Sequence, residues 1–343
     1  MRALVKYQKG NGFVDIREVP APVLQEDEVL IKVSACGICG SDIHILHDEF
    51  PNEPPVIMGH EFSGTIEKVG SLVSDWSRGD KVVTELHTAA CGKCKLCRTG
   101  NQHICPAKRP LGSKTNGGFA EYVKVPGRLV HKIPDGVDLF EAAITEPTAI
   151  CIHGLTEFGE VKPGDCIVIF GAGPIGFISA LIAKKIGVRS VIIAGTNKDE
   201  PVRLKVACRF GLDAVVNVEK QNLPQIVESL TGGIGADVVI EASGAPAAIN
   251  QATRICRRQG SIIAIGLTQK EQIPVNWNEA VIKETKIYMP FSSTWTSWEL
   301  ALQFLSEGVV ETKALTNSRP LEEWKEAFDD LENGRAIKTL LTI

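Results

Sequence analysis

The 343-residue sequence lacks an excess of positive charge, low-complexity segments and short-period repeats. Its 37 Lys and Arg stand against 41 Asp and Glu, and the net charge of −4 argues against a dedicated nucleic-acid-binding protein, which usually carries a basic face. A composition of 44% hydrophobic and 23% charged residues is typical of globular proteins and excludes a collagenous, disordered or disulfide-scaffold chain. The length is sufficient for two domains of ordinary size.

We expect no secretory signal, because the N-terminal MRALVKYQKG contains no apolar stretch followed by a small-residue cleavage site. Residues 166–183 carry no charge and approach the length of a membrane helix, but three glycines and a proline lie near their middle. A strand, a glycine turn and a buried helix explain this stretch better. We therefore expect a cytoplasmic protein, in whose reducing compartment the ten cysteines more often bind metal than form disulfides.

Two patterns of apolar residues divide the sequence. In the first part, short apolar runs bounded by Gly, Pro or Asp predict strands at 3–7, 28–35, 61–69 and 81–84. After Pro163, strand-length apolar runs alternate with helical segments, which predicts a parallel sheet of βαβ units. The expected strands are 167–170, 190–194, 214–216, 238–241 and 261–265, and the expected helices are 175–186, 203–210, 223–230 and 247–256.

Four closely spaced cysteines follow the pattern C-x2-C-x2-C-x7-C; they are Cys91, Cys94, Cys97 and Cys105. Two residues between cysteines allow a tight turn to bring both sulfurs to one point, and four thiolates suit a closed tetrahedral zinc site. Such a site leaves no position for a substrate, so we expect a structural zinc. Free or disulfide-linked cysteines and an iron–sulfur cluster are the alternatives. Flanking basic residues suit a nucleic-acid-binding zinc ribbon or a solvated loop, and we prefer the loop.

A second group of metal-capable residues is spread over three short runs. They are Cys39, Ser41 and His44 in GICGSDIH, His60 and Glu61 in GHE, and Glu146 directly before a proline. Each residue alone has an ordinary structural explanation, as a hydrogen-bonded histidine or a core cysteine. Only their combination points to a metal site.

Together these runs resemble the zinc-dependent medium-chain alcohol dehydrogenases, particularly the branch of sorbitol (polyol) and threonine dehydrogenases. The matching pieces run in family order across most of the chain. They are GICGSDIH (37–44), GHEFSGTIEKVG (59–70), GDKVV (79–83), the four-cysteine segment, GGFAEYVKVP (117–126), EPTAICIHG (146–154) and GAGPIG (171–176). The resemblance implies an oxidoreductase with one catalytic zinc, one structural zinc and NAD or NADP.

The resemblance also implies an α/β fold of two domains. A GroES-like, β-rich catalytic domain would span 1–149 and 288–343, with the structural zinc lobe at 88–108. A Rossmann domain with a doubly wound parallel sheet would span 150–287 and bind the cofactor. From about Tyr288, two amphipathic helices (295–306 and 321–333) and a strand (336–342) should pack back on the first domain. A homodimer or homotetramer is implied as well.

For the catalytic zinc, the resemblance implies four ligands or near-ligands, namely Cys39, His60, Glu61 and Glu146. One of the two glutamates would bind directly and the other directly or through water, which leaves a position for the substrate oxygen. The alcohol would lose a hydride to the nicotinamide and become a ketone or aldehyde. Its proton would leave through Ser41, the cofactor ribose and His44. The neighbouring Cys36 is assigned to packing.

The glycine-rich turn GAGPIG follows an apolar strand and opens a helix, which makes it a dinucleotide-binding fingerprint. The first glycine makes the turn, the second admits the pyrophosphate, and the third allows close helix–strand packing, while the helix N-terminus attracts the phosphates. The expected contacts are Gly171, Gly173, Pro174, Ile175 and Gly176. The resemblance adds Ile265, Gly266 and Leu267 and the stretch 289–291, with Met289 and Phe291, near the nicotinamide.

An acid that binds the ribose 2′-hydroxyl of NAD usually ends the next strand. Counting as in sorbitol-type relatives, that position is Gly195, and the stretch that follows it is longer than theirs. Residues able to meet a 2′-phosphate, which would favour NADP, are Thr196, Lys198 and Arg203. If the chain folds back toward the strand end, Asp199 or Glu200 would instead bind the ribose 2′-hydroxyl of NAD. We expect NAD or NADP, with a slight preference for NADP.

The run EPTAICIHG resembles the polyol branch more than the threonine branch, so the expected substrate is a polyol or sugar alcohol. Three pocket positions depart from sorbitol-type relatives, with Ile45 for a tyrosine, and Pro290 and Phe291 for an arginine and a tyrosine. Because such a pocket holds fewer hydroxyl groups, an L-threonine 3-dehydrogenase or a dehydrogenase of small diols or secondary alcohols stays open. A catalytically silent, cofactor-sensing binding protein is the rival from another class. No nucleic-acid or membrane partner is expected.

Overall fold

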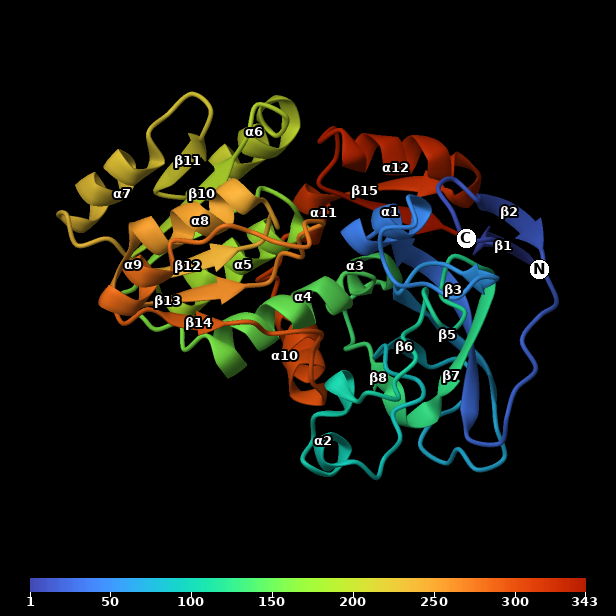
Figure 1. The fold of residues 1–343 in the computed structure, drawn as a ribbon. Helices are drawn as coiled ribbons and strands as arrows, with labels where there is room; N and C mark the ends of the chain where they lie inside the picture. Colours follow the sequence, from blue (N-terminus) through green and yellow to red (C-terminus); the bar gives the residue numbers. More distant parts are fainter. The chain divides into compact units, whose positions relative to one another are not determined.

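The computed structural model describes residues 1–343 and divides into two compact units. The first unit contains residues 1–149, 293–332 and 338–343, and the second contains 150–292 and 333–337. In Figure 1 the first unit is coloured blue to green and red, and the second runs from green through yellow to orange. None of the helices is both long and apolar enough to cross a membrane.

Antiparallel strand pairing builds most of the first unit. A small sheet has the order β2-β1-β4, and a larger one has the order β15-β16-β3-β5-β6-β8, with β7 also paired to β3. The strands are β1 (Arg2–Lys6), β2 (Val14–Glu18), β3 (Glu28–Gly37), β4 (Val56–Ile57), β5 (Glu61–Val69), β6 (Lys81–Thr84), β7 (Tyr122–Pro126), β8 (Val130–Lys132), β15 (Thr316–Pro320) and β16 (Lys338–Thr342). Because β16 pairs with β3, the tail packs back on the first part of the chain as predicted.

Short helices connect these strands, and the three longest helices are α4, α10 and α12. The helical elements are α1 (Gly40–Leu46), α2 (Lys95–Arg98), η1 (Gln102–Ile104), η2 (Gly127–Leu129), α3 (Leu139–Ala142), α4 (Thr145–Ile152), α10 (Trp295–Ser306), α11 (Thr312–Leu315), η6 (Leu321–Glu323) and α12 (Trp324–Glu332). Helix α10 begins at its predicted residue because the side chain of Thr294 accepts a hydrogen bond from the N–H of Ser297.

The second unit is built on a parallel sheet of order β11-β10-β9-β12-β13-β14, as the alternating pattern predicts. Its strands are β9 (Cys166–Phe170), β10 (Ser190–Gly195), β11 (Ala214–Asn217), β12 (Ala236–Glu241), β13 (Cys256–Ala264) and β14 (Lys286–Tyr288). Its helices are η3 (His153–Phe158), α5 (Pro174–Ile186), η4 (Glu200–Leu204), α6 (Lys205–Ala207), η5 (Cys208–Phe210), α7 (Leu223–Thr231), α8 (Pro246–Ile255) and α9 (Trp277–Ile282). Every residue of β9 and β10 is buried, as expected for parallel strands covered on both faces.

Two expected elements of the second unit differ in the structure. The helix expected at 203–210 begins at Glu200, because Pro201 is favoured in the first helical turn. It then passes from π through α to 3-10 geometry. Strand β13 begins at Cys256, the last residue of the helix expected at 247–256. Cys256 pairs with Ala236 of β12, and the pairing of the two strands then shifts in register. The uncharged residues 166–183 form β9, the glycine turn and most of α5, as expected.

Candidate metal and cofactor sites

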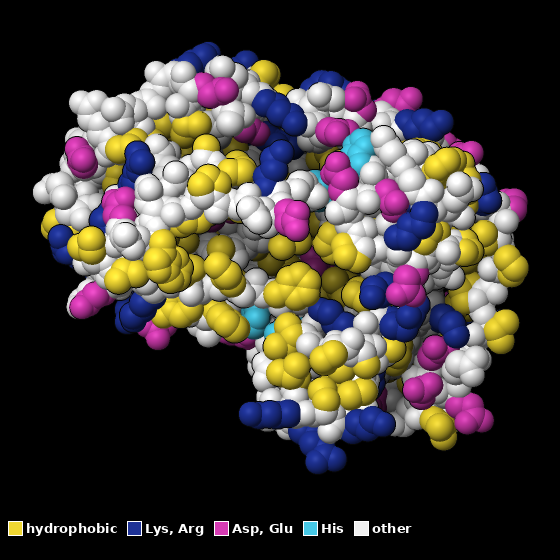
Figure 2. Space-filling view, in the orientation of Figure 1, with side chains coloured by type: hydrophobic (Ala, Val, Ile, Leu, Met, Phe, Trp, Pro, Cys, Tyr) yellow, Lys and Arg dark blue, Asp and Glu magenta, His cyan; other side chains and the backbone are white.

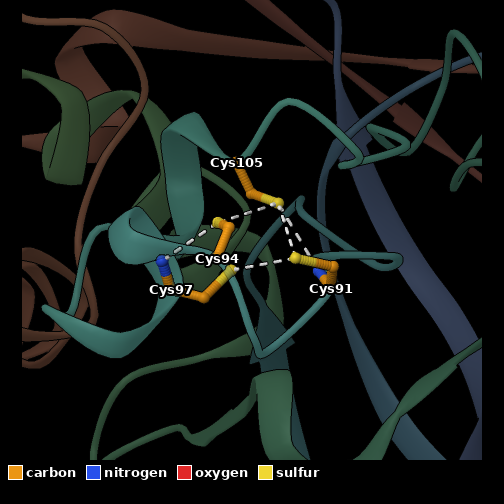
Figure 3. Close-up of side chains that lie close together, drawn as sticks. All are labelled: Cys91, Cys94, Cys97 and Cys105. Carbon is orange, nitrogen blue, oxygen red and sulfur yellow. Dashed lines mark hydrogen bonds between the residues drawn. The ribbon is translucent and has the colours of Figure 1, made fainter.

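Four cysteine side chains of the first unit point toward one another (Figure 3). The Sγ atom of Cys91 lies 3.9 Å from that of Cys97 and 3.7 Å from that of Cys105. The Sγ atoms of Cys94 and Cys105 are 3.9 Å apart. Sulfurs at the corners of a regular tetrahedron around zinc, with Zn–S of ~2.3 Å, are about 3.8 Å apart. Since none of the four thiols is in a disulfide, this spacing fits a closed tetrahedral zinc site.

Backbone N–H groups lower the pKa of Cys91 and Cys105, whereas burial raises the pKa of Cys97 to about 12. The N–H of Cys97 lies 3.4 Å from the Sγ of Cys94, and that of Cys91 lies 3.4 Å from the Sγ of Cys105. Hydrogen bonds from the backbone of Lys93 and Cys94 lower the pKa of Cys91 to about 6. Figure 2 shows basic side chains over α2 at the tip of this lobe, where they are exposed to solvent.

A second candidate metal site forms where β3 and β5 lie side by side. Gly37 at the end of β3 pairs with Glu61 at the start of β5, so Cys39, just beyond β3, comes close to the His60–Glu61 dipeptide. One ligand atom from each of Cys39, His60 and Glu61 lies within 4.8 Å of the others. A thiol, an imidazole and a carboxylate suit zinc, and three protein ligands leave a fourth position for a substrate.

Asp42 connects the two segments that carry these groups. Its buried carboxylate accepts hydrogen bonds from the N–H of Cys39 at 2.9 Å and from that of Gly59 at 3.3 Å. One of its oxygens lies 3.8 Å from Nδ1 of His60, the kind of partner that orients a metal-binding histidine. Burial alone would lower the pKa of His60, but the charge of Asp42 and the contact with Cys39 raise it well above its usual value. The pocket therefore favours positive charge.

A buried lysine from the last strand, Lys338, lies against the same group. Its ammonium donates a hydrogen bond to the backbone oxygen of Ile38 at 2.8 Å and forms an ion pair with Glu61. Burial would lower the pKa of Lys338, but the charges of Glu61 and Cys39 raise it, so the lysine stays protonated. Lys338 was not predicted from the sequence, where its only signal is one lysine at the head of the apolar strand KTLLT.

Glu146 lies in α4, outside the group of three ligand atoms but close enough to be affected by their charges. Burial raises the pKa of Glu146 to about 7, against the opposing charge of His60. The structure therefore joins Cys39, His60 and Glu61 in one ligand group, with Glu146 as a nearby buried carboxyl. The site contains one thiol and three carboxyl groups but only one lysine and one histidine, so its acidic groups outnumber its basic ones. Such a set of donors fits a divalent cation.

Ser41 and His44 lie three residues apart in α1, which places them on the same side of the helix. Nδ1 of His44 lies 3.2 Å from Oε2 of Glu49, and both side chains reach solvent. Ile45, which the sequence places at the substrate pocket, is fully buried in the hydrophobic core. Helix α1 thus extends from the candidate ligand Cys39 to the partly exposed His44.

The glycine turn of the second unit joins β9 to α5. Gly171 has a φ of 106°, a conformation that side chains disfavour, and Gly173 and Pro174 form the N-terminus of α5. A Cβ atom on Gly176 would lie 1.9 Å from the backbone oxygen of Gly171, so the helix approaches the turn too closely for any side chain. This is the geometry that the dinucleotide fingerprint requires.

At the end of β10, Asp199 is folded back beside Gly195. A Cβ atom on Gly195 would lie 3.1 Å from a carboxylate oxygen of Asp199. That carboxylate accepts the N–H of Thr196 at 2.9 Å, its hydroxyl at 3.0 Å and Nη1 of Arg203 at 3.0 Å. Arg203 is held further by a bond from its Nε to the backbone oxygen of Ala336 at 2.9 Å. The acid therefore occupies the space beside the strand end, but protein groups engage both of its oxygens.

The loop expected near the nicotinamide follows β13. Ile265 and Gly266 donate their N–H groups to the backbone oxygen of Glu241, at 2.8 and 2.9 Å. Three of the expected contact residues have exposed side chains, namely Leu267, Met289 and Phe291. Glu241 itself was not among the residues that the sequence analysis selected.

A further group of ionisable residues, buried except for Glu299, connects β8 with α10 in the first unit. Nδ1 of His131 lies 2.6 Å from Glu299, its Nε2 lies 3.4 Å from Glu85, and Glu85 also lies 3.6 Å from His87. The ring of His131 stacks on Trp298 at a centroid distance of 5.6 Å. Burial would lower the pKa of His131, but hydrogen bonds with Glu85 and Glu299 raise it above its usual value.

We expect this raised pKa to make the stability of the protein depend on pH. Protonated His131 stabilises the fold fully below its unfolded pKa of about 6.5, and this contribution disappears as the pH rises through the higher folded value. Between pH 6 and pH 9, wild type should therefore lose more unfolding free energy than His131→Gln. Urea unfolding at both pH values measures this difference, and equal losses would rule out the assignment.

Comparison with known proteins identifies one family along the whole chain. Residues 25–135 match the family model of the alcohol dehydrogenase GroES-like domain, and residues 174–307 match that of zinc-binding dehydrogenases. The chain is 39% identical to sorbitol dehydrogenase of Halalkalibacterium halodurans, covering 100% of this chain and 99% of that one. It is 35% identical to D-arabitol-phosphate dehydrogenase of Enterococcus avium, covering 99% and 97%.

Among solved structures, a zinc-binding dehydrogenase of Sinorhizobium meliloti bound to NADP is similar over 100% of this chain and 99% of that chain. Its TM-score is 0.91 and its sequence identity is 30%. Both halves of the sequence therefore match one family in sequence and in fold, with the zinc and NAD(P) chemistry for which its members are named. The chain belongs to the zinc-dependent medium-chain alcohol dehydrogenases.

Proposed function

We propose that this protein oxidises a secondary alcohol of a polyol or sugar alcohol to a ketone, or catalyses the reverse reduction, by hydride transfer to or from NAD(P). The observation that carries the proposal is the group formed by Cys39, His60 and Glu61, whose ligand atoms lie within 4.8 Å of one another. Relatives named for sorbitol and for arabitol phosphate, similar along the whole chain, support a polyhydroxylated substrate. The free thiols that both metal sites need favour a reducing compartment, and we place the protein in the cytoplasm.

The residues of the site divide the work of the reaction. Zinc held by Cys39, His60 and a carboxylate would supply Lewis acidity at the substrate oxygen, and NAD(P) at the glycine turn would exchange the hydride. The hydroxyl of Ser41 accepts the proton of the alcohol as it passes its own proton into a relay that ends at His44. His44, whose Nδ1 lies 3.2 Å from Glu49, releases one proton to solvent. Loss of one hydride and one proton from the CH–OH group leaves the carbonyl product.

We propose NADP as the preferred cofactor. An NAD-binding acid needs free carboxylate oxygens for the two ribose hydroxyls. Here Asp199 lies beside Gly195, but its oxygens already accept bonds from Thr196 and Arg203. The same arrangement holds a guanidinium and a hydroxyl at the end of β10, and these donors suit a 2′-phosphate that takes the place of Asp199 as their acceptor.

A panel of alcohols, measured by nicotinamide absorbance with NAD and with NADP, tests substrate and cofactor together. We expect the highest kcat/KM with a polyol, and a kcat/KM for NADP roughly tenfold or more above that for NAD, because a charged pair at the phosphate is worth about 1.5–3 kcal/mol. The panel includes phosphorylated polyols, 2,3-butanediol and L-threonine. Faster oxidation of L-threonine or butanediol than of any polyol would contradict the substrate proposal, and equal use of both cofactors would contradict the preference. Cofactor binding without any turnover would support the cofactor-sensing alternative.

We also propose that two copies pair through β14. This strand lies at the edge of the parallel sheet, and exposed apolar side chains surround it in the sequence, namely Trp277, Val281, Ile282 and Met289. Figure 2 shows hydrophobic side chains gathered over α9 and β14. A strand edge related to its own copy by a twofold axis pairs with itself in antiparallel fashion, which satisfies its free backbone groups and covers the apolar side chains. A homotetramer would need a second surface in addition.

Replacing Ile282 with aspartate should therefore shift the protein from dimer to monomer, because the change places a charge in the proposed interface. Ile282 is 66% exposed, so the fold of the single chain should tolerate the substitution. Leu72→Asp, at a position that is 72% exposed in the first unit, is the matched control and should stay dimeric. Sedimentation equilibrium measures both variants; a monomeric wild type, or a dimeric Ile282→Asp, would exclude this interface.

A further inference from the structure

Glu241 is a buried carboxylate at the edge of the parallel sheet where the cofactor segments begin. It is the last residue of β12, which lies between β9 and β13. It pairs with Phe170, directly before the glycine turn, and with Ala264, directly before the 265–267 loop. The mechanism described above assigns Glu241 no part, although its side chain is only 1% exposed.

The carboxylate of Glu241 binds the loop that follows it. Its Oε1 accepts hydrogen bonds from the N–H of Ser243 at 2.9 Å, from the hydroxyl of Ser243 and from the N–H of Gly244 at 3.1 Å. Its Oε2 also lies 3.1 Å from the N–H of Gly244. A buried carboxylate without donors is costly, so these bonds both fix the loop and stabilise the charge.

The loop held by Glu241 is packed tightly against the segment expected at the nicotinamide. A Cβ atom on Gly244 would lie 2.0 Å from the backbone oxygen of Leu267. A Cβ atom on Gly266 would lie 2.4 Å from the backbone nitrogen of Gly244 and 2.6 Å from Oε2 of Glu241. Backbone meets backbone here without intervening side chains, so a shift of the 243–244 loop displaces residues 266 and 267 as well.

The glycine turn lies against the same loop from the other side. The N–H of Ala242 donates to the backbone oxygen of Phe170 at 2.9 Å. A Cβ atom on Gly171 would lie 3.1 Å from the carbonyl carbon of Ala242. The residues directly after Glu241 therefore touch both the pyrophosphate turn and, through Gly244, the nicotinamide loop.

We propose that Glu241 is a positioning residue for the nicotinamide half of the cofactor. Its carboxylate fixes the 242–244 loop, and this loop sets the distance between the glycine turn and residues 265–267. A loop fixed by these hydrogen bonds needs less ordering when a cofactor binds. The inference rests on the proposed binding of NAD(P) at the glycine turn and adds a residue that acts through other residues.

The test compares Glu241→Gln with a matched variant at the other end of the same strand. Glutamine preserves volume but leaves one acceptor oxygen for three donors and turns an NH₂ group toward Gly244. Asp237 is also a carboxylate of β12; it accepts the N–H of Cys166 at 2.7 Å and Nε of Arg257 at 2.6 Å, at the strand end away from Glu241. Asp237→Asn therefore removes a comparable structural contact without touching the 242–244 loop.

Dissociation constants for NADPH and NADH, measured by nicotinamide fluorescence, and melting temperatures without cofactor are the readouts. We expect Glu241→Gln to raise the dissociation constant of the reduced cofactor roughly tenfold or more, since a displaced binding loop costs contacts as well as orientation. Asp237→Asn should lower the melting temperature without changing the dissociation constant. In turnover, Glu241→Gln should raise the KM for the cofactor and lower kcat, whereas Asp237→Asn should change neither.

Two further variants keep the test decisive if Glu241→Gln does not fold. Glu241→Asp retains the charge but shortens the side chain. Ser243→Ala removes the hydroxyl group that donates to Glu241, at an exposed residue, and leaves the carboxylate in place. Both should weaken cofactor binding by a smaller factor than Glu241→Gln. Wild-type affinity in the folded variants, or an equal loss in Asp237→Asn, overturns the inference. Failure of wild type itself to bind either nucleotide would instead overturn the proposed cofactor site.

Discussion

Replacing Cys39 with alanine should remove one of two zinc ions per chain and reduce turnover far more than the fold. The thiol is one of only three ligand atoms that lie within 4.8 Å of one another at this site, so its loss leaves an imidazole and a carboxylate to hold the metal. Loss of an outer hydrogen-bonding partner costs roughly 10–100-fold in metal affinity or activity. Loss of a direct ligand should exceed this range. Metal analysis by mass spectrometry and initial rates measure the two effects.

Cys36 supplies a matched control for this substitution. It lies three residues before Cys39, is fully buried, and would be 2.8 Å from a Cβ atom on Gly59, which is the environment of a packing residue. Cys36→Ala should therefore retain both zinc ions and most of the activity. Loss of zinc in Cys36→Ala but not in Cys39→Ala, or loss of both ions in Cys39→Ala, would contradict the assignment of ligands.

Replacing Lys338 with methionine should produce the largest loss of stability. Methionine preserves the length of the side chain but removes the only cation paired with the buried carboxylate of Glu61. Removing one partner of a buried ion pair typically costs about 3–5 kcal/mol, because the other charge stays buried without compensation. Urea unfolding of the metal-free protein, in which no zinc compensates the charge of Glu61, should show a loss of this size. In the zinc-loaded protein, turnover should fall because Glu61 loses its fixed position.

A second substitution separates the charge of Lys338 from its packing. In Lys338→Met/Glu61→Gln the uncompensated carboxylate is gone, so the double variant should recover much of the stability that Lys338→Met loses. Arg78→Met removes the cation of an exposed pair with Glu67 at 2.8 Å and should cost less than about 1 kcal/mol. Strictly additive effects of the two buried substitutions would show that Lys338 stabilises the protein by packing alone.

The parts of the site that the sequence predicted are local. Cys39 lies in a short run whose role the family resemblance implied, and the glycine turn joins a strand to a helix within a few residues, so its local context predicts its geometry. Asp42 lies inside the same run, but only the structure shows that it binds the N–H groups of both Cys39 and Gly59. An acid three residues after a helix N-cap was the signal that was available for it.

The residues that the sequence did not predict depend on contacts between distant strands. Lys338 reaches Glu61 because β16 pairs with β3, and β3 pairs with β5. Glu241 acts through glycines that tolerate close backbone contact, which no single motif reveals. Residue patterns report the periodicity of one element at a time, and they carry no information about which strand lies next to it.

The same limit explains two of the strands that the sequence did not predict. β2 and β15 contain mostly polar or half-exposed residues, VDIRE and TNSRP, and β15 exists because it pairs in parallel with β16. The buried strands β9 and β10, with their continuous apolar runs, were predicted within a few residues. Burial therefore produced a readable pattern, whereas pairing at a sheet edge did not.

Anomalous diffraction at the zinc absorption edge tests the central claim most directly. The account predicts two peaks per chain in crystals of the zinc-loaded protein. One should lie among the sulfurs of Cys91, Cys94, Cys97 and Cys105. The other should lie within bonding distance of Cys39 and His60 and disappear in Cys39→Ala. A single peak at the four cysteines in wild type, or a second peak away from Cys39 and His60, would contradict the account.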